Sequence, residues 1–386
     1  MNLSYLYEFC TVRQLEYVQA VEQHGSNNKA AQALGVGRRV VDKAVSTAKR
    51  KAAMQGMSPD HDMTKTVPDG YVVKGVSTYY GEDGKPKAQW VKSSLDEQKR
   101  LEAIKEAFEA MADELPRVAP TPAPSVTSAH LCNVYTLTDS HVGALAWHKE
   151  NLQADWDLDI AEKTLIGCFE HMVLNSPPAQ VGFVNQLGDF LHSDGILPVT
   201  PTSHHILDQD GRFAKVAQVA VRILRHVVNF ALQKHEKVVV LLAEGNHDIT
   251  SSIWLRMMFK ALYENEPRVE VIDSVLPYYI YQHGKTLLAF HHGHLKKNEG
   301  LPILFASQFP KAWGNTEKRY CHVGHRHHYD EKEHSGMRVI QHSTLAARDA
   351  YSARGGWMSE RQVTAMTYHT EYGDVARNTI TPEMLA

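Results

Sequence analysis

Five short polar clusters in the second part of the chain combine aspartate, asparagine and histidine, with no cysteine among them. In chain order they are Asp139-Ser140-His141, Gly188-Asp189, Gly245-Asn246-His247-Asp248, His291-His292-Gly293-His294 and Gly324-His325-Arg326-His327. Mixed carboxylate and imidazole ligands suit Mn²⁺, Fe or Zn²⁺ in octahedral or five-coordinate sites, and they do not suit a structural zinc. Because roughly seven ligands exceed the need of one ion, the set predicts two divalent ions that share a carboxylate and act on phosphorus.

Each cluster directly follows an apolar run of β-strand type. The five runs are residues 131–138, 180–187, 237–243, 285–290 and 319–323. Helical patterns lie between them, at residues 159–174, 212–234 and 251–263. Because layered α/β proteins build their sites at the carboxyl ends of strands, we expect the clusters to meet at one edge of an α/β body.

The composition is that of a globular chain. Its 386 residues are 43% hydrophobic and 22% charged, a length that suggests roughly two to three domains. With 41 Lys and Arg against 44 Asp and Glu, the net charge of −3 excludes a general polyanion binder, so any basic surface must be local. Four widely spaced cysteines exclude a zinc ribbon and a disulfide scaffold. The sequence has no apolar run of membrane-spanning length and no signal-peptide pattern, so we expect a cytoplasmic protein without a membrane partner.

A proline-rich stretch at residues 115–128 marks the main boundary of the chain. It holds four of the 16 prolines and favours an extended, semi-rigid spacer. It separates a body at residues 129–386 from an N-terminal module, which we divide into residues 1–57 and 58–114.

The first 57 residues contain three helical patterns, at 12–24, 27–34 and 38–54, with glycine turns between them. Two short helices joined by a glycine turn, the second of them basic, predict a helix-turn-helix that binds DNA. The alternative is a three-helix bundle whose basic face contacts protein. The cations expected to contact DNA lie on the third helix and are Arg38, Arg39, Lys43, Lys49, Arg50 and Lys51.

Residues 58–114 add two further elements. Residues 71–92 predict a β-hairpin with its turn at Glu82-Asp83-Gly84, either a wing against the DNA backbone or a packing element. Residues 94–115 predict an amphipathic helix that opens on a capping box from Ser94 to Glu97. This helix packs within the module or pairs with a second copy of the chain to form a homodimer.

Taken in order, the five clusters resemble the motifs of the calcineurin-like metallophosphoesterase superfamily over about residues 131–345. The string GDFLHSDG, in which His192 follows Asp189, resembles the repair-exonuclease branch. The layout of helix-turn-helix, linker and phosphoesterase resembles proteins of bacteriophages, which would place it in the bacterial host cytoplasm. The resemblance implies a four-layer α/β/β/α sandwich, in which two sheets are flanked by helices.

The resemblance also assigns roles to the clustered residues. Asp189 would bridge two metal ions, and a hydroxide between the ions would be the nucleophile. His247 would donate a proton to the leaving oxygen, and Asp248 would orient the His247 imidazole. The ions are expected to be Mn²⁺, with Fe, Zn²⁺, Ni²⁺ or Mg²⁺ as alternatives. The metal ligands implied by the resemblance are Asp139, His141, Asp189 and His327 for the first ion, and Asp189, Asn246, His292 and His325 for the second.

Four further side chains are candidates for contact with the substrate or with the ligands, namely His192, His294, Arg256 and Arg326. Residues 193–212 form a long polar insertion that we expect to overhang the site as a substrate wall. Residues 348–361 combine three arginines with Tyr351 and Trp357, a mixture that either stacks bases and holds phosphates or covers a sheet edge.

The function expected from these features is metal-dependent hydrolysis of phosphodiesters, with DNA as substrate and as partner of the N-terminal module. One alternative is a phosphomonoesterase, a protein phosphatase or a nucleotide phosphodiesterase. Another is a DNA-binding regulatory or packaging protein whose phosphoesterase body is vestigial, although the intact ligands at every cluster argue against it.

Overall fold

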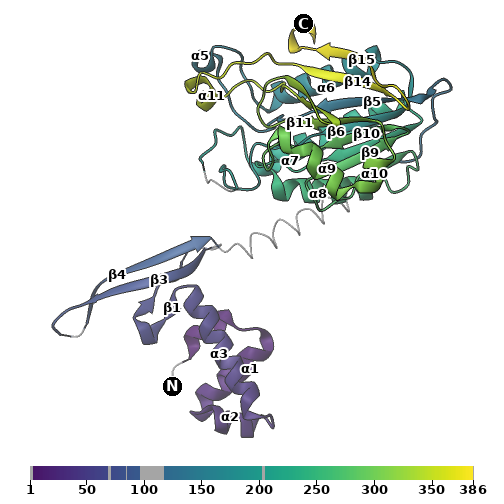
Figure 1. Cartoon of the computed structure of the whole chain (residues 1–386). Helices are drawn as coiled ribbons and strands as arrows, with labels where there is room; N and C mark the ends of the chain where they lie inside the picture. Colours follow the sequence, from purple (N-terminus) through teal and green to yellow (C-terminus); the bar gives the residue numbers. More distant parts are fainter. Residues whose placement is uncertain (1–2, 68–70, 84, 96–116, 202–204, 386) are drawn as a thin grey trace. The chain divides into compact units, whose positions relative to one another are not determined.

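The computed structural model describes residues 3–67, 71–83, 85–95, 117–201 and 205–385 (Figure 1). The chain divides into two compact units, Met1–Met111 and Ala112–Ala386. Within the described residues, no helix is both long and apolar enough to cross a membrane.

The N-terminal unit has the three expected helices, α1 (Val12–His24), α2 (Asn27–Ala33) and α3 (Arg38–Met54), after a 3-10 turn η1 (Ser4–Phe9). Their ends follow local chemistry. Thr11 and Gln14 form a capping box at the start of α1, and Gly25, at φ 77°, ends it. The helices pack around buried aliphatic side chains, which include Leu6, Val18, Val21, Ala30, Val41 and Ala48.

A β-hairpin follows the helices, as the turn signal predicts. It consists of β3 (Tyr71–Tyr80) and β4 (Pro86–Leu95) in antiparallel register. A small ribbon of β1 (Met57–Ser58) and β2 (Met63–Thr64), joined by η2 (Pro59–His61), precedes it. Tyr80 Oη in the hairpin donates to Asp62 Oδ2 at 2.6 Å, which ties the two together. The amphipathic helix expected at residues 94–115 lies almost entirely outside the described residues, so its packing stays a prediction.

The C-terminal unit is built on two sheets. In the first, β5, β6, β7 and β8 are parallel and β14 and β15 extend the sheet antiparallel beyond β5. In the second, β10, β11 and β13 are parallel and β9 and β12 are antiparallel edges. The strand bounds are β5 Ser128–Leu137, β6 Ala179–Gln186, β7 Lys237–Leu242, β8 Val269–Val271, β9 Tyr279–His283, β10 Thr286–Phe290, β11 Lys318–Val323, β12 Asp330–His334, β13 Met337–Gln341, β14 Val363–His369 and β15 Gly373–Ile380.

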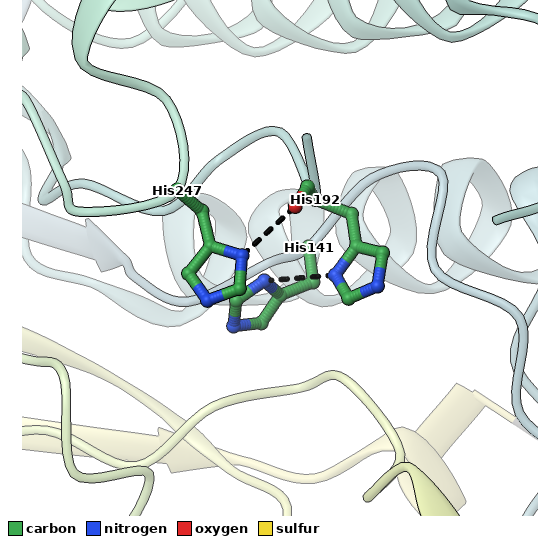
Figure 2. Close-up of side chains that lie close together, drawn as sticks. All are labelled: His141, His192 and His247. Atoms are coloured by element: carbon green, nitrogen blue, oxygen red, sulfur yellow. Dashed lines mark hydrogen bonds between the residues drawn. The ribbon is translucent and has the colours of Figure 1, made fainter. Parts of the chain in front are cut away.

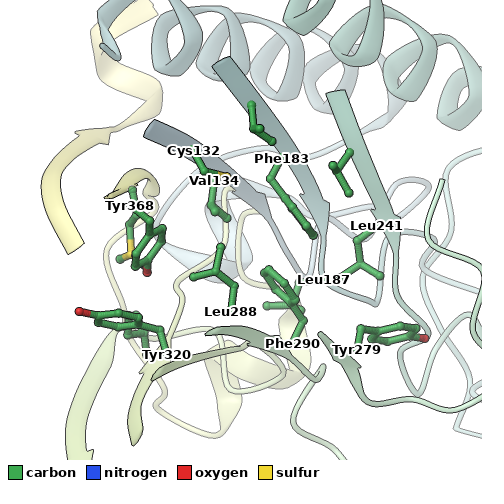
Figure 3. Close-up of a cluster of buried hydrophobic side chains, with 14 of the residues drawn as sticks. Cys132, Val134, Phe183, Leu187, Leu241, Tyr279, Leu288, Phe290, Tyr320 and Tyr368 are labelled. Carbon is green, nitrogen blue, oxygen red and sulfur yellow. The ribbon is translucent and has the colours of Figure 1, made fainter. Parts of the chain in front are cut away.

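The two sheets face each other across one hydrophobic core (Figure 3). Phe183 of the first sheet stacks on Phe290 of the second, with ring centroids 4.6 Å apart. Val134 and Leu241 on one side, and Leu288 on the other, are fully buried in the same cluster. Because alternate side chains of a strand point to opposite faces, the remaining apolar positions must be covered by helices.

Helices supply the two outer layers, so the expected α/β/β/α sandwich is confirmed (Figure 1). The first sheet is covered by α6 (Leu158–Asn175), α7 (Phe213–Leu232) and α8 (Ile249–Leu262), and the second by α9 (Leu301–Gln308) and α10 (Pro310–Gly314). Short turns complete the unit, namely α5 (His148–Asn151), α11 (Ala350–Arg354), η3 (Asn298–Gly300) and η4 (Pro382–Leu385).

The described part of the proline-rich stretch, residues 117–127, has no helix or strand and is hydrogen-bonded to the C-terminal unit. Val118 N donates to Leu262 O at 3.0 Å, and Thr121 N donates to the buried Glu266 carboxylate at 2.7 Å. Arg268 in turn donates to Thr121 O at 2.9 Å. These residues are therefore held against the body, and a truncation that keeps the C-terminal unit whole must begin before them.

Candidate metal centre

The polar clusters lie in the loops that follow β5, β6, β7, β10 and β11. Five of their residues have a left-handed backbone conformation. Among the described residues, seven non-glycine positions have positive φ, and five of these are Asp139 (50°), His141 (42°), Asp189 (48°), His325 (70°) and His327 (56°). This conformation costs on the order of 1–3 kcal/mol at each position and persists only where the surroundings hold it. Here cross-loop hydrogen bonds hold it, since Asp139 N donates to Gly188 O at 3.1 Å and His141 N to Asp189 O at 3.0 Å.

A first group of possible ligand atoms comes from Asp139, His141 and His327, all within 4.8 Å of one another. His327 Nε2 lies 3.1 Å from Asp139 Oδ1 and 3.3 Å from His141 Nε2. The Asp139 carboxylate is fully buried and accepts from Thr138 Oγ1 at 2.6 Å and from His325 N at 2.9 Å. Burial alone would raise the pKa of Asp139, but the neighbouring imidazoles of His327 and His292 outweigh it and hold the pKa well below its ordinary value.

A second group comes from Asp189, His292 and His325, again within 4.8 Å. His292 Nδ1 lies 2.9 Å from Leu187 O, and since a carbonyl only accepts, Nδ1 carries the proton. The other nitrogen, Nε2, lies 3.1 Å from Asp189 Oδ2 and 3.9 Å from Asp139 Oδ1. Burial lowers the pKa of His292, yet the charges of Asp189 and Asp139 prevail and raise it to about 10. The position between two carboxylates therefore favours a positive charge.

The donor set fits divalent metal ions. Asn246 Oδ1 is buried and accepts no hydrogen bond within the described part of the chain, and the buried His292 Nε2 faces the carboxylates of Asp189 and Asp139. A buried acceptor without a partner costs about 1–3 kcal/mol, and a cation would satisfy it. Carboxylate, amide and imidazole donors at such spacing are those of Mn²⁺, Fe or Zn²⁺ sites. The Leu187 carbonyl fixes the His292 ring from behind, as is common for imidazoles that bind a metal.

Two motif glycines are required by close approach to the carboxylates. A Cβ on Gly245 would lie 2.1 Å from Asp189 Oδ1, and a Cβ on Gly324 would lie 2.6 Å from Asp139 Oδ2. Both distances are shorter than a van der Waals contact. Glycine in Gly-Asn-His-Asp and Gly-His-Arg-His therefore lets the loops close around the two aspartates.

Two further histidines, His192 and His247, lie beside His141 of the first group (Figure 2). His247 Nδ1 donates to His192 O at 2.8 Å, which leaves Nε2 as its other polar atom. The ring of His141 lies against His247, with centroids 4.7 Å apart, and His141 Nδ1 is 3.4 Å from His192 Nδ1. Burial, with the nearby His247, lowers the pKa of His192 to about 4, so this ring is neutral near pH 7. The His192 ring therefore lies in the site, and the His192 backbone carbonyl orients the His247 ring through its hydrogen bond.

Asp248 has hydrogen-bond partners other than the His247 ring that it was expected to orient. Its carboxylate is 1% exposed and does not contact the His247 ring, whose Nδ1 is bonded to the His192 carbonyl. It accepts instead from four backbone N–H groups, those of Asp189 (3.2 Å), Phe190 (2.7 Å), Leu191 (3.2 Å) and Gly245 (3.0 Å). Asp248 therefore ties together the loops after β6 and β7.

The remaining candidates separate into two kinds. His294 lies beside the second group, its ring 5.4 Å from that of His292, and Arg326 is exposed and lines the cleft described below. Arg256 is 6% exposed, donates to Ser274 O and is not among the described residues that line that cleft. This hydrogen bond joins α8 to the loop after β8.

A cleft of about 940 Å³ opens onto the centre. Its floor includes His141, Asp189, Asn246 and His247. The lining also includes Thr200 and residues 205–208 of the insertion at 193–212, and most of residues 348–361. His204, a further histidine of the insertion, lies outside the described residues.

Sequence reasoning missed the residues that hold Asp139. Thr344 Oγ1 donates to Asp139 O at 2.6 Å, and Thr138 Oγ1 donates to the carboxylate. Thr138 could have been found from its place next to Asp139. Thr344 carries no such signal, because it lies 205 residues away along the chain.

In the N-terminal unit, α3 presents its cations to solvent, opposite the buried Val41, Ala44 and Ala48. Arg38 lies 3.4 Å from Asp42, and Lys49 lies 3.4 Å from Asp60, both in exposed pairs. The other predicted contacts, Arg39, Lys43, Arg50 and Lys51, are exposed as well. Exposed surface pairs are weak, so all six cations are available to a polyanion.

No protein-family model and no curated protein matches this chain. Solved structures give only a low overall similarity. A predicted phosphoesterase of Streptococcus pneumoniae is 12% identical, with 66% of this chain and 92% of that chain covered and a TM-score of 0.31. Wild-type Vps29 of Entamoeba histolytica with zinc (13% identity, 65% and 99% covered, TM-score 0.28) and an archaeal phosphodiesterase (13%, 64% and 99%, TM-score 0.31) are similar to the same extent. At these values the function must be inferred from the side chains of the site.

Proposed function

We propose that the C-terminal unit hydrolyses phosphodiesters with two divalent metal ions, Mn²⁺ in preference to Fe, Zn²⁺, Ni²⁺ or Mg²⁺. The observation that carries this proposal is the pair of adjacent carboxylate–imidazole groups on the floor of one cleft. The order of the five clusters, which resembles calcineurin-like metallophosphoesterases, supports it. The ligands would be Asp139, His141, Asp189 and His327 for one ion, and Asp189, Asn246, His292 and His325 for the other.

When bound, the ions would neutralise charge on the phosphate and activate water near neutral pH. The chain's own residues would position and protonate the substrate. The His192 carbonyl holds His247 Nδ1–H, so that the protonated ring offers Nε2–H to a leaving oxygen in the cleft. Arg326, exposed on the same cleft, would hold a phosphate oxygen.

The metal requirement is tested with the full chain. Chelation should abolish hydrolysis of bis-p-nitrophenyl phosphate, and Mn²⁺ should restore it with two ions per chain by elemental analysis. Asp189→Asn should abolish turnover, because it removes charge beside both groups. Asp273→Asn is the matched control, since Asp273 is 62% exposed in a surface pair with Lys260. Full activity after rigorous chelation, or with one ion per chain, would overturn the dinuclear centre.

We propose DNA as the substrate, because the chain that contains the cleft also has six exposed cations on α3 that can bind a polyanion. The test compares labelled single- and double-stranded DNA with bis-p-nitrophenyl and p-nitrophenyl phosphate under the same Mn²⁺ conditions. DNA and the diester should be cleaved, and the monoester should be poor. A strong preference for the monoester would identify a phosphatase instead.

The N-terminal unit is proposed to bind DNA through α3. Arg39→Glu with Arg50→Glu should weaken DNA binding and flatten its salt dependence by about one unit of slope for each phosphate that the variant no longer neutralises. Arg13→Glu is the matched control, because Arg13 is an exposed arginine on α1. Hydrolysis of bis-p-nitrophenyl phosphate should be unchanged in both. If the reversed variant binds and cuts DNA like the control, the basic face serves protein contacts.

A further inference from the structure

An aromatic pair stands on the rim of the cleft. Tyr351 is 72% exposed and Trp357 is 58% exposed, and both line the cleft together with His247 and Asp189. Their ring centroids are 5.4 Å apart. Leaving two large aromatic rings in water forgoes the free energy of burying them, and such rings at a site commonly contact a ligand. We call this pair, Tyr351 and Trp357, the aromatic lip.

Backbone and side-chain hydrogen bonds fix the conformation of the segment that carries the aromatic lip. Trp357 N donates to Ser352 O at 3.2 Å, and Asp349 caps α11 by accepting from Ser352 N at 2.8 Å. The Trp357 ring packs on Gly355, where an added Cβ would lie 2.8 Å from the ring. Arg348 fastens the start of the segment by donating to Asn151 O at 2.6 Å. The two rings are therefore presented by a built turn.

The arginines of residues 348–361 and of the cleft are of two kinds, those bonded to backbone carbonyls and those exposed to solvent. Arg348 and Arg361 donate to the carbonyls of Asn151 and Leu345, at 2.6 and 2.7 Å, and so serve the fold. Arg354 is exposed on α11, between Tyr351 and Trp357 in the sequence, and Arg326 is exposed in the cleft. Aromatic faces next to free guanidinium groups form the combination that binds bases and phosphates of single strands.

We infer that the aromatic lip stacks on an unpaired nucleobase next to the phosphate at the metal centre, so that the preferred substrate is a single-stranded or frayed nucleic acid. This rests on the proposed function, since it needs a phosphodiester on the cleft floor. In a duplex the base faces are covered by neighbouring bases, whereas an unpaired base has a free face. Stacking tolerates any base, so no sequence preference follows from it.

The test uses the full chain with Mn²⁺ and a labelled single-stranded oligonucleotide, its fully abasic counterpart and a blunt duplex. Trp357→Ala should lower kcat/KM for the single strand about tenfold, mainly through KM, which corresponds to ~1.4 kcal/mol and lies in the range of one stacked base. Its activity on the abasic strand should not change. Trp357→Phe, which keeps an aromatic face, should retain most of the preference for bases.

Trp147→Ala is the matched control, because Trp147 is 56% exposed and is not among the described residues that line the cleft. A second readout needs no turnover. In the Asp189→Asn background, single-stranded DNA should quench tryptophan fluorescence, and this quenching should fall with Trp357→Ala but not with Trp147→Ala.

Equal losses on the base-bearing and abasic strands would show that Trp357 only supports the fold, and would overturn the inference. A wild-type preference for blunt duplex would overturn it as well. If the wild type hydrolyses no diester at all, the proposed function fails, whereas the quenching experiment still decides whether the aromatic lip stacks on bases.

Discussion

Replacing Asp248 with asparagine is expected to destabilise the C-terminal unit by weakening the link between two loops of the metal centre. Each carboxylate oxygen of Asp248 accepts two backbone N–H groups, those of Asp189 and Gly245 on Oδ1 and those of Phe190 and Leu191 on Oδ2. An asparagine has one oxygen, so whichever way its amide turns, an NH₂ group faces two N–H donors.

The magnitude follows from the two donors that are left without an acceptor. The site is 1% exposed, so water does not replace the missing oxygen. Each unsatisfied buried group costs about 1–3 kcal/mol, which gives a loss of roughly 2–6 kcal/mol in the free energy of unfolding. Because the same loops carry Asp189, metal affinity should fall with stability.

The assay is urea unfolding of the full chain, followed by tryptophan fluorescence. Five of the six tryptophans lie in residues 112–386, so the signal reports mainly the C-terminal unit. Asp273→Asn is the control, and its surface pair with Lys260 should contribute at most ~1 kcal/mol.

If Asp248→Asn unfolds within ~0.5 kcal/mol of the Asp273 control, the four hydrogen bonds do not stabilise the loops and this reasoning fails. Unchanged stability together with a loss of turnover would favour the other role, in which Asp248 orients the His247 imidazole.

Three further outcomes are expected. His247→Ala should leave the metal content near normal and lower kcat by roughly 10²–10⁴; the loss, measured by steady-state kinetics, should be smaller for p-nitrophenyl esters than for DNA, and equal losses would count against proton donation. Gly245→Ala should reduce bound metal in elemental analysis, because its Cβ would lie 2.1 Å from Asp189 Oδ1. Normal metal content would show that the loop moves to accommodate the methyl group. Hydrogen bonds from Arg377 lower the pKa of Glu331 to about 2, so its carboxylate stabilises the fold above its unfolded value of 4.5 and loses that effect as the pH falls towards 2. Glu331→Gln should therefore lower the free energy of unfolding by on the order of 1–3 kcal/mol at pH 7 and by less near pH 3, and a pH-independent difference would contradict this.

Much of the fold and of the centre could be predicted from residue order alone. The apolar runs predicted β5, β6, β7, β10 and β11, and the position of each cluster after its strand predicted one edge for all of them. These predictions succeed because strand formation follows the local apolar pattern, and because helical crossovers between strands favour a parallel sheet. The three N-terminal helices were predicted to within one residue for the same reason, since caps and glycine turns are local.

Other properties depended on contacts between distant residues. The motif Gly-Asn-His-Asp places Asp248 next to His247, yet its carboxylate is bonded to the loop after β6, some 57–59 residues earlier. Arg256 had the charge to bind phosphate, but packing of α8 turned it towards the Ser274 carbonyl. The partners of residues 117–127 and the exposure of Trp357 likewise arise only when the chain is folded. A residue type specifies which bonds are chemically available, and the tertiary structure selects among them, because it alone sets which donors and acceptors are within reach.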